Sequence, residues 1–229
     1  MRRSSYTAIP CTAEARSVAN LREQLARVGR AAVKAGLVVG SGGNLSAREP
    51  GSDQIWITGT GTWLDRLDDA SFVAVCLDDG SVHRRGDGST VEPSVELALH
   101  LATYRARPDV NAIVHLHPQL AVMLDALGER IRLVTTDHVM YVRRVARVPF
   151  HPPGSRELAE AAARAAADGT NCVILAHHGC SVLGESVDMA YRRALNLEEA
   201  ARMTYRALLL TGQGGGGPIR ECPADFEQA

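Results

Sequence analysis

The sequence has little cysteine, no long apolar run and no recognisable leader segment. Its 5 cysteines are odd in number and never spaced as Cys-x-x-Cys, so neither a zinc finger nor a disulfide framework is expected. No run approaches the roughly 18 apolar residues that a membrane-spanning helix needs. The start of the chain carries arginines without the apolar segment of a signal peptide. These absences predict a cytoplasmic protein that has no membrane partner.

An excess of charge of either sign is also lacking. The 25 Lys and Arg residues stand against 26 Asp and Glu residues, which gives a formal net charge of −1. This balance argues against a nucleic-acid partner bound through bulk electrostatics, and it still permits a local pocket for a small phosphorylated ligand. With 45% hydrophobic and 22% charged residues, the composition is that of an ordinary globular protein. We expect a single domain over residues 1–229, with a flexible glycine-rich tail from about residue 212.

The spacing of apolar residues predicts helices and strands in alternation. Because several neighbouring strands are joined by tight turns and no βαβ unit repeats, we expect a mixed sheet with helices on both faces, in three layers. The expected helices are 13–37, 93–107, a short one ending near 127, 156–168 and 186–210. The expected strands are 55–57, 72–77, 81–85, 112–117, 132–135, 145–150 and 172–176.

Three histidines lie in or directly after expected strands. Residues two apart in a strand point to the same face, so the imidazoles of His115 and His117 project together. His178 lies just beyond the end of another buried strand. Three convergent imidazoles are the ligand set of a catalytic zinc ion with one open position. The alternative is a chance pair on a half-exposed strand, and we interpret His177 as a solvated turn residue.

A helix start and two glycine-rich loops are suited to an anion. The helix expected to begin at Pro93 places Ser94 in its first turn, where free N–H groups and the helix dipole favour negative charge. Glu96 follows in the same helix, although an acid near a helix start is also ordinary capping chemistry. The loops 42–46 and 58–62 offer backbone N–H groups that can cradle phosphate. Neither loop matches a nucleotide-binding pattern, and most glycine loops are simply turns.

Taken together and in this order, the segments GGNLSAR, ITGTGT, EPSVE, IVHLHP and LAHHGCSVLG resemble the class II aldolase and adducin family. Within it the sequence is most similar to the zinc-dependent L-fuculose-1-phosphate aldolases, which are related to the L-ribulose-5-phosphate 4-epimerases. The similarity runs from about residue 21 to residue 208. It implies a three-layer α/β/α sandwich with a mixed, largely antiparallel sheet. It also implies a homotetramer whose active sites lie between subunits.

The resemblance assigns roles to individual residues. Those that match the family's zinc ligands are His115, His117 and His178. Glu96 matches the acid that transfers a proton in the aldolases. Those that match positions holding the substrate phosphate are Asn44, Thr60, Gly61 and Ser94.

The sequence departs from the family pattern in two places. The family has two consecutive serines before the acid, whereas the second position here is Val95, which removes one hydroxyl donor to the phosphate. The aldolases also use a tyrosine of the neighbouring subunit on the far side of the substrate, and segment 134–141 has no tyrosine in register. Asp137 or His138 is expected to take that role, as an acidic residue does in the epimerases.

The reaction implied by the resemblance is zinc-dependent retro-aldol cleavage. The substrate is a ketose 1-phosphate, and the products are dihydroxyacetone phosphate and an aldehyde, with Mn²⁺, Fe²⁺ or Co²⁺ as alternatives to Zn²⁺. A decarboxylase, dehydratase or epimerase with the same metal site is the alternative, acting on another sugar phosphate or on a non-phosphorylated substrate. A metal-free scaffold of the adducin type is a third hypothesis. The intact set of three histidines and Glu96 argues against a scaffold.

Overall fold

The computed structural model describes residues 12–83, 91–212 and 217–225. Its strands form one sheet in the order β4-β3-β2-β1-β5-β8-β7-β6. Neighbouring strands are antiparallel except for β6 and β7, which are parallel. The predicted mixed, largely antiparallel sheet is therefore confirmed. The strands are β1 (Asn44–Ala47), β2 (Gln54–Thr58), β3 (Phe72–Cys76), β4 (Val82–His83), β5 (Ala112–Leu116), β6 (Val145–Val148), β7 (Cys172–Leu175) and β8 (Gly179–Gly184).

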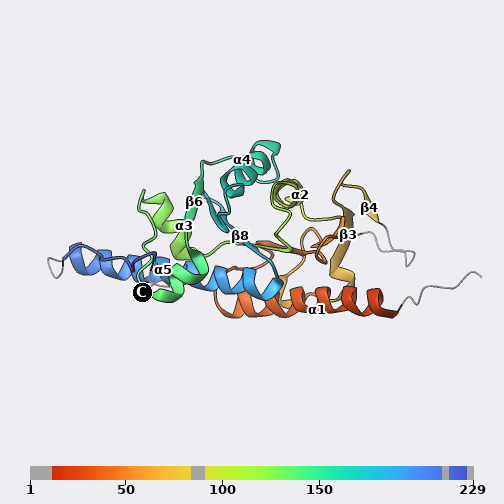
Figure 1. Ribbon diagram of the computed structural model, residues 1–229, viewed down its shortest axis with the longest axis horizontal. Helices are drawn as coiled ribbons and strands as arrows, with labels where there is room; N and C mark the ends of the chain where they lie inside the picture. The colour runs from red at the N-terminus through yellow and green to blue at the C-terminus, as the bar shows by residue number, and fades with distance from the viewer. Residues whose placement is uncertain (1–11, 84–90, 213–216, 226–229) are drawn as a thin grey trace, which may run out of the picture.

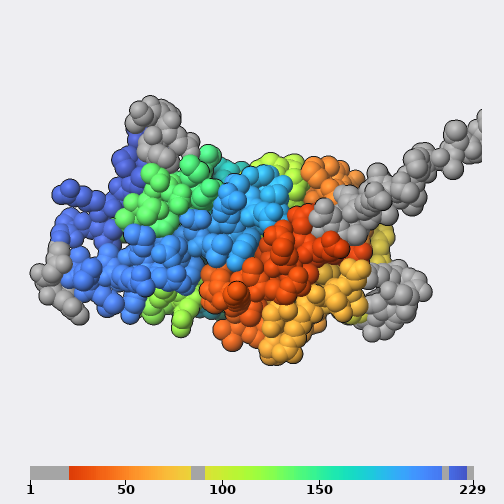
Figure 2. Space-filling view, turned by 90° about the horizontal axis from the view of Figure 1, so that it is seen from below, coloured from red at the N-terminus to blue at the C-terminus, as the bar shows by residue number. Residues whose placement is uncertain are grey.

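Helices cover both faces of this sheet, which confirms the predicted three layers. One apolar core lies between the sheet and α1, α3 and α5, and a second lies between the sheet and α2 and α4. Figure 1 shows α2 and α4 above the sheet and α1 and α5 below it. Figure 2 shows that α1 and α5 lie beside each other on the lower face. The helices are α1 (Thr12–Lys34), α2 (Leu97–Ala106), α3 (Gln119–Ala126), α4 (Arg156–Ala166) and α5 (Val187–Gly212), with short turns η1 (Leu64–Arg66), η2 (Asp69–Ser71) and η3 (His138–Val142).

Two central strands, β1 and β8, are not evident from the apolar pattern. In β1, the side chains of Leu45 and Ala47 enter the core between the sheet and α1 and α5, while those of Asn44 and Ser46 are buried on the opposite face of the sheet. A strand buried on both faces does not alternate between apolar and exposed polar residues. β8 is also buried along its whole length, and glycines at both of its ends make it resemble a turn in the sequence.

The strand expected at 132–135 is wrong. Its backbone groups bond to side chains instead of to a neighbouring strand: Arg132 N–H donates to the hydroxyl of Thr204, and Val134 N–H donates to Nδ1 of His138. The segment therefore has no ladder to join, although its residues have strand-like character. In the tail, Cys222 N–H donates to the carbonyl of Leu133. The predicted tail lies partly outside the described residues, as do residues 84–85 of the strand expected at 81–85.

The helix expected to begin at Pro93 begins at Leu97. Pro93 forms an isolated bridge with Gly59, and Ser94 N–H donates to the carbonyl of Thr58. These contacts hold the segment extended against the end of β2. Ser94 consequently lies before α2 and not in its first turn, which corrects the basis of its prediction as an anion site.

Glu198 of α5 fixes the start of α3, directly after the strand that carries two of the histidines. Its two carboxylate oxygens accept the backbone N–H groups of Leu120 and Ala121, each at 3.0 Å. Pro118, the residue before α3, offers no side-chain cap. A buried carboxylate from another helix therefore satisfies N–H groups that every helix start leaves free.

Alanine at position 198 is expected to lower the free energy of unfolding by about 2–3 kcal/mol, because it leaves two N–H donors without an acceptor in a largely buried site. The neighbouring Glu199 pairs with Arg202 in a partly exposed ion pair, so Glu199→Ala is the matched control. That control should cost about 1 kcal/mol or less. Urea denaturation of both variants measures the difference, and equal losses would contradict the capping role.

No helix in the part of the chain that the structure describes is long and apolar enough to cross a membrane.

Candidate metal centre

The register of the three central strands positions the site. His115 of β5 lies opposite Asn44 of β1 on one side and Ser181 of β8 on the other. Because side chains alternate along a strand, His115 lies on the α2 side of the sheet, while Val114 and Leu116 enter the other core. The end of β5 therefore presents functional groups toward the start of α2.

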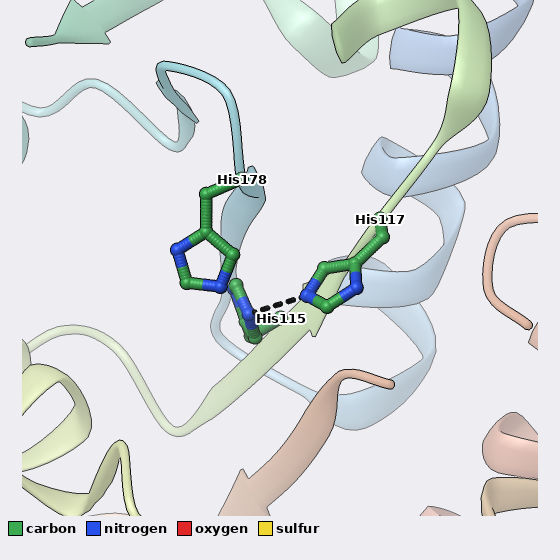
Figure 3. A group of neighbouring side chains, drawn as sticks. All are labelled: His115, His117 and His178. Atoms are coloured by element: carbon green, nitrogen blue, oxygen red, sulfur yellow. Dashed lines mark hydrogen bonds between the residues drawn. The ribbon is translucent and has the colours of Figure 1, made fainter. Parts of the chain in front are cut away.

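The three predicted histidines converge. Their ring centroids lie 4.9–5.1 Å apart in each pairing, and one ligand nitrogen of each lies within 4.8 Å of the others. Figure 3 shows His115 projecting from β5, His117 from just beyond the end of that strand, and His178 from the turn after β7. The Nε2 atoms of His115 and His117 are 3.1 Å apart. The chance-pair alternative is therefore wrong for this strand.

Backbone contacts set the orientation of the histidines. Nδ1 of His115 lies 3.0 Å from the carbonyl oxygen of Cys180, to which it donates, so Nε2 is left facing the other rings. His178 ends the turn between β7 and β8, and its N–H donates to the carbonyl of Leu175. His177 takes the left-handed conformation in this turn, with φ 57°, and is exposed. Its interpretation as a solvated turn residue is confirmed.

Two glycines let the backbone approach these rings. Gly43 has φ 72°, and a Cβ there would lie 2.6 Å from the carbonyl oxygen of His115. A Cβ on Gly179 would lie 2.3 Å from the carbonyl oxygen of Leu116 and 2.6 Å from the His117 ring. Real side chains do not tolerate such distances, so both positions require glycine. The glycines around the site therefore serve close packing of the histidine-bearing segments.

Glu96 lies against the same histidines. Its Oε2 is 2.9 Å from Nε2 of His115, and its Oε1 is 3.5 Å from Nε2 of His178. Burial alone would raise the pKa of Glu96, but the hydrogen bond and charge of His115, the charge of His178 and the amide of Asn44 lower it to about 2. The carboxyl group is therefore ionised at neutral pH. Its Oε1 is buried without a hydrogen-bond partner.

The donor set fits a divalent metal ion. Burial, followed by the charges of its neighbours, lowers the pKa of His117 to about 4, and burial also lowers the pKa of His178. Imidazoles must be neutral to bind a metal, so these shifts favour ligation. Three imidazoles beside a carboxylate with one unpartnered oxygen are the groups that a zinc-like ion uses. His115, His117 and His178 are thus the residues that can hold a metal here.

A cavity of about 330 Å³ opens beside the histidines. His117, His178 and Glu96 line it, together with the loop at 41–43. The structure brings all four residues predicted to bind the substrate phosphate to this cavity: Asn44, Thr60, Gly61 and Ser94. Two of their hydroxyls already have local partners: Thr60 Oγ1 donates to the carbonyl of Pro93, and Ser94 Oγ accepts the N–H of Glu96.

The two far-side candidates are not among the residues that line this cavity. Asp137 is exposed. His138 is buried at the start of η3, where its Nδ1 accepts the N–H groups of Val134 and Thr135. His138 therefore anchors the segment, and Asp137 is the one of the two that faces solvent.

Sequence reasoning missed His100. It is fully buried beneath the site, with Nε2 2.5 Å from Oδ1 of Asn44 and Nδ1 2.6 Å from Oγ of Ser46. Two signals point to it. It follows Glu96 by four residues, and Asn44 and Ser46 are polar residues two apart in a buried strand, which require a polar partner.

Protonation of His100 is expected to be coupled to folding. Burial, followed by the charge of His115, lowers its pKa to about 3, whereas an unfolded histidine has a pKa of about 6.5. The unfolded state therefore binds the extra proton, so this contribution to stability is complete above about pH 6.5 and is lost as the pH falls toward 3.

The free energy of unfolding should fall by up to about 1.4 kcal/mol per pH unit from this group alone. Urea denaturation between pH 7 and pH 5 measures the slope for the wild-type chain and for His100→Gln. In His100→Gln the free energy of unfolding should change less steeply with pH, by up to about 1.4 kcal/mol per pH unit, which corresponds to one proton. Identical slopes would show that His100 is not held neutral by the fold.

Comparison with known proteins places this geometry in one family. Residues 23–205 match the class II aldolase and adducin N-terminal domain. An L-fuculose phosphate aldolase of Methanocaldococcus jannaschii is 34% identical over 173 residues, covering 76% of this chain and 89% of that protein. A 3-oxo-tetronate 4-phosphate decarboxylase of Escherichia coli is 35% identical over 191 residues, covering 81% of this chain and 86% of that protein.

A solved structure shows the same fold. The crystal structure of YgbL from Klebsiella pneumoniae superposes with a TM-score of 0.77 at 33% identity, covering 90% of this chain and 95% of that one. The matched region contains all three histidines, Glu96 and both glycine-rich loops. The two matched enzymes named above, an aldolase and a decarboxylase, are both lyases. A match over most of the chain, together with this fold, shows that the protein belongs to the class II aldolase and adducin family of enzymes.

Proposed function

We propose that this protein is a zinc-dependent aldolase that cleaves a ketose 1-phosphate of the fuculose-phosphate type. The products are dihydroxyacetone phosphate and an aldehyde. The observation that carries the proposal is the meeting of three imidazoles, an ionised carboxylate and two glycine-rich loops at one cavity. The curated L-fuculose phosphate aldolases that match this chain support the substrate class.

The imidazoles and the carboxylate of the site have different roles in the reaction. Breaking the C–C bond leaves its electron pair on the dihydroxyacetone phosphate half as an enediolate. Zn²⁺ held by the three imidazoles supplies Lewis-acid stabilisation of the developing negative charge. In the synthetic direction the carboxylate of Glu96 removes a proton from the carbon that will form the bond. By microscopic reversibility, the same group returns that proton during cleavage.

The remaining proton transfer needs a second group, on the aldehyde oxygen. Among the described residues that line the cavity, Glu96 is the one carboxylic acid. We propose that a neighbouring subunit of a homotetramer supplies the second group from its η3 segment, with Asp137 as the acid–base residue and His138 holding the turn. Exposed Val95 lines the cavity, and exposed Trp63 directly follows the lining residue Thr62, so apolar surface is available there for a subunit contact. Sedimentation tests the assembly, because a tetramer has about four times the 24.5 kDa of one chain.

Release of dihydroxyacetone phosphate tests the reaction. Zinc-loaded protein would be offered a panel of ketose 1-phosphates, with a chelator-treated sample as the control and parallel loading with Mn²⁺, Fe²⁺ or Co²⁺. We expect release that the chelator abolishes. Absence of release from protein that still holds about one zinc per chain would contradict the aldolase assignment.

Decarboxylation is the second candidate, because Glu96 is the one carboxylic acid among the described residues that line the cavity. Loss of CO₂ from a 3-oxo acid also leaves an electron pair beside a carbonyl, but it needs no acid–base group for an aldehyde oxygen. A curated 3-oxo-tetronate 4-phosphate decarboxylase is 35% identical to this chain. Release of CO₂ from a phosphorylated 3-oxo acid, without aldol cleavage, would establish it.

A further inference from the structure

A line of buried polar side chains runs from Glu96 into the space between β1 and α2. Asn44 and Ser46 come from β1, and His100 and Tyr104 come from α2. All four are 5% exposed or less. His100, Ser46 and Tyr104 are absent from the residues that line the cavity. Apart from Asn44, which also lines the cavity, the line therefore lies behind the carboxylate, on the side away from the cavity.

Each member contacts the next at hydrogen-bond distance. Nδ2 of Asn44 is 2.9 Å from Oε2 of Glu96, and Oδ1 of Asn44 is 2.5 Å from Nε2 of His100. Nδ1 of His100 is 2.6 Å from the hydroxyl of Ser46. That hydroxyl is 2.9 Å from the hydroxyl of Tyr104. No member of the line lacks a partner.

These contacts permit one direction of donation. An ionised carboxylate only accepts, so the amide NH₂ of Asn44 must donate to Glu96, which leaves the amide oxygen to accept from His100. Nε2 of His100 must then carry the proton. The buried ring is neutral, so its Nδ1 accepts from Ser46.

The line ends in groups that keep this direction. The hydroxyl of Ser46 is committed to His100 as a donor and accepts from the hydroxyl of Tyr104. The sequence of donors therefore runs from Tyr104 through Ser46, His100 and Asn44 to Glu96.

The opposite tautomer would reverse the amide. With the proton on Nδ1, Nε2 of His100 would accept, Asn44 would turn its NH₂ toward the ring, and its carbonyl oxygen would face the carboxylate of Glu96. Two acceptors at 2.9 Å repel, so the carboxylate would lose its support on this side. Glu96 and an Nε2–H ring of His100 agree on one orientation of the amide, whereas an Nδ1–H ring would oppose the carboxylate. The Nε2–H form of His100 therefore holds the amide in the orientation that the carboxylate needs.

We propose that His100 is a positioning residue, which fixes the amide orientation of Asn44 and through it holds the carboxylate of Glu96 against the three histidines. His100 acts indirectly, because it contacts Asn44 and does not line the cavity. The consequence for turnover rests on the proposed function, in which Glu96 transfers a proton. The tautomer of His100 and the orientation of the Asn44 amide do not depend on that function.

Nitrogen NMR of the wild-type holoenzyme tests the tautomer directly. The two ring nitrogens of a neutral imidazole have well-separated chemical shifts, so the spectrum reports which one carries the proton. We expect His100 in the Nε2–H form. The Nδ1–H form, or a rapidly exchanging mixture, would overturn the proposal without reference to any reaction.

Two variants of the same residue separate positioning from general support. The amide nitrogen of glutamine reaches the place of Nε2 and can still donate to Asn44, whereas the shorter asparagine reaches only the place of Nδ1. We expect the side-chain amide protons of Asn44 to exchange slowly with water in the wild type and in His100→Gln. In His100→Asn they should exchange at least about tenfold faster. Equal exchange in all three proteins would overturn the proposal, and this readout needs no turnover.

Kinetics complete the test. With zinc content checked in each sample, His100→Gln should keep kcat within about threefold, and His100→Asn should lower kcat at least about tenfold with little change in KM. Equal kcat in the two variants, or a loss traced to zinc alone, would overturn the positioning role. If the wild type cleaves none of the ketose 1-phosphates, the proposed function fails, and the tautomer and exchange results still decide this inference.

Discussion

Alanine in place of His117 is expected to abolish zinc binding and turnover together. The ring nitrogen of His117 lies 3.1 Å from that of His115, and the three rings converge from two segments far apart in the chain. Removing one of three ligands leaves two imidazoles, which cannot complete a tetrahedral site with one open position. Zinc should fall from about one per chain to near zero, and the affinity should weaken well over 100-fold. Metal analysis after dialysis, alongside an activity assay, measures both.

The neighbouring turn offers a matched control. His177 is exposed, directly precedes His178 and is not among the residues that can hold the metal. Because its φ of 57° favours a flexible or small polar residue, His177→Asn is a better substitution than alanine. We expect normal zinc content and turnover for this control. Retention of zinc by His117→Ala would break the ligand assignment, and loss of zinc from both variants would indicate damage to the turn instead.

The histidine site could be predicted because it depends on local rules. Residues two apart in extended backbone share a face, so His115 and His117, which directly follows the end of β5, could be paired from the sequence. His178 required only the end of a buried strand and a turn. Their shared location could not be derived locally. It follows from the order of the sheet, in which β5 and β8 are neighbours and β7 comes next.

The features that sequence reasoning missed depend on tertiary contacts. The start of α2 is delayed to Leu97 because the end of β2 captures the backbone of Ser94, a contact between segments that no local pattern reports. The position of His100 four residues after Glu96 is a weak signal by itself, and the polar partners Asn44 and Ser46 become informative only once β1 is known to be a strand. In the segment at 132–135, backbone N–H groups bond to the side chains of Thr204, in α5, and of His138, a few residues later, which defeats a prediction from propensity.

Glutamine in place of Glu96 is expected to leave zinc bound and to lower turnover at least about 100-fold, the size of the loss of an acid–base group. The three imidazoles remain, and glutamine nearly matches the shape of glutamate, so the cavity keeps its form. What is lost is the group that exchanges a proton with carbon. Glu92→Gln is the matched control, because Glu92 is exposed four residues earlier and does not line the cavity, and its turnover should stay within about twofold.

Proton exchange isolates this step from the rest of the reaction. Dihydroxyacetone phosphate incubated in D₂O with an aldolase exchanges a carbon-bound proton even when no aldehyde is present, so the readout does not depend on Asp137, His138 or a neighbouring subunit. The carboxylate of Glu96, 2.9 Å from Nε2 of His115, is the one carboxylate among the described residues that line the cavity, and it is the base that we propose. We expect Glu96→Gln to slow deuterium incorporation by the same factor of about 100 as turnover. Exchange at the wild-type rate in zinc-bound Glu96→Gln would show that another group moves this proton, whereas slow exchange with intact zinc would separate proton transfer by Glu96 from metal binding by the histidines.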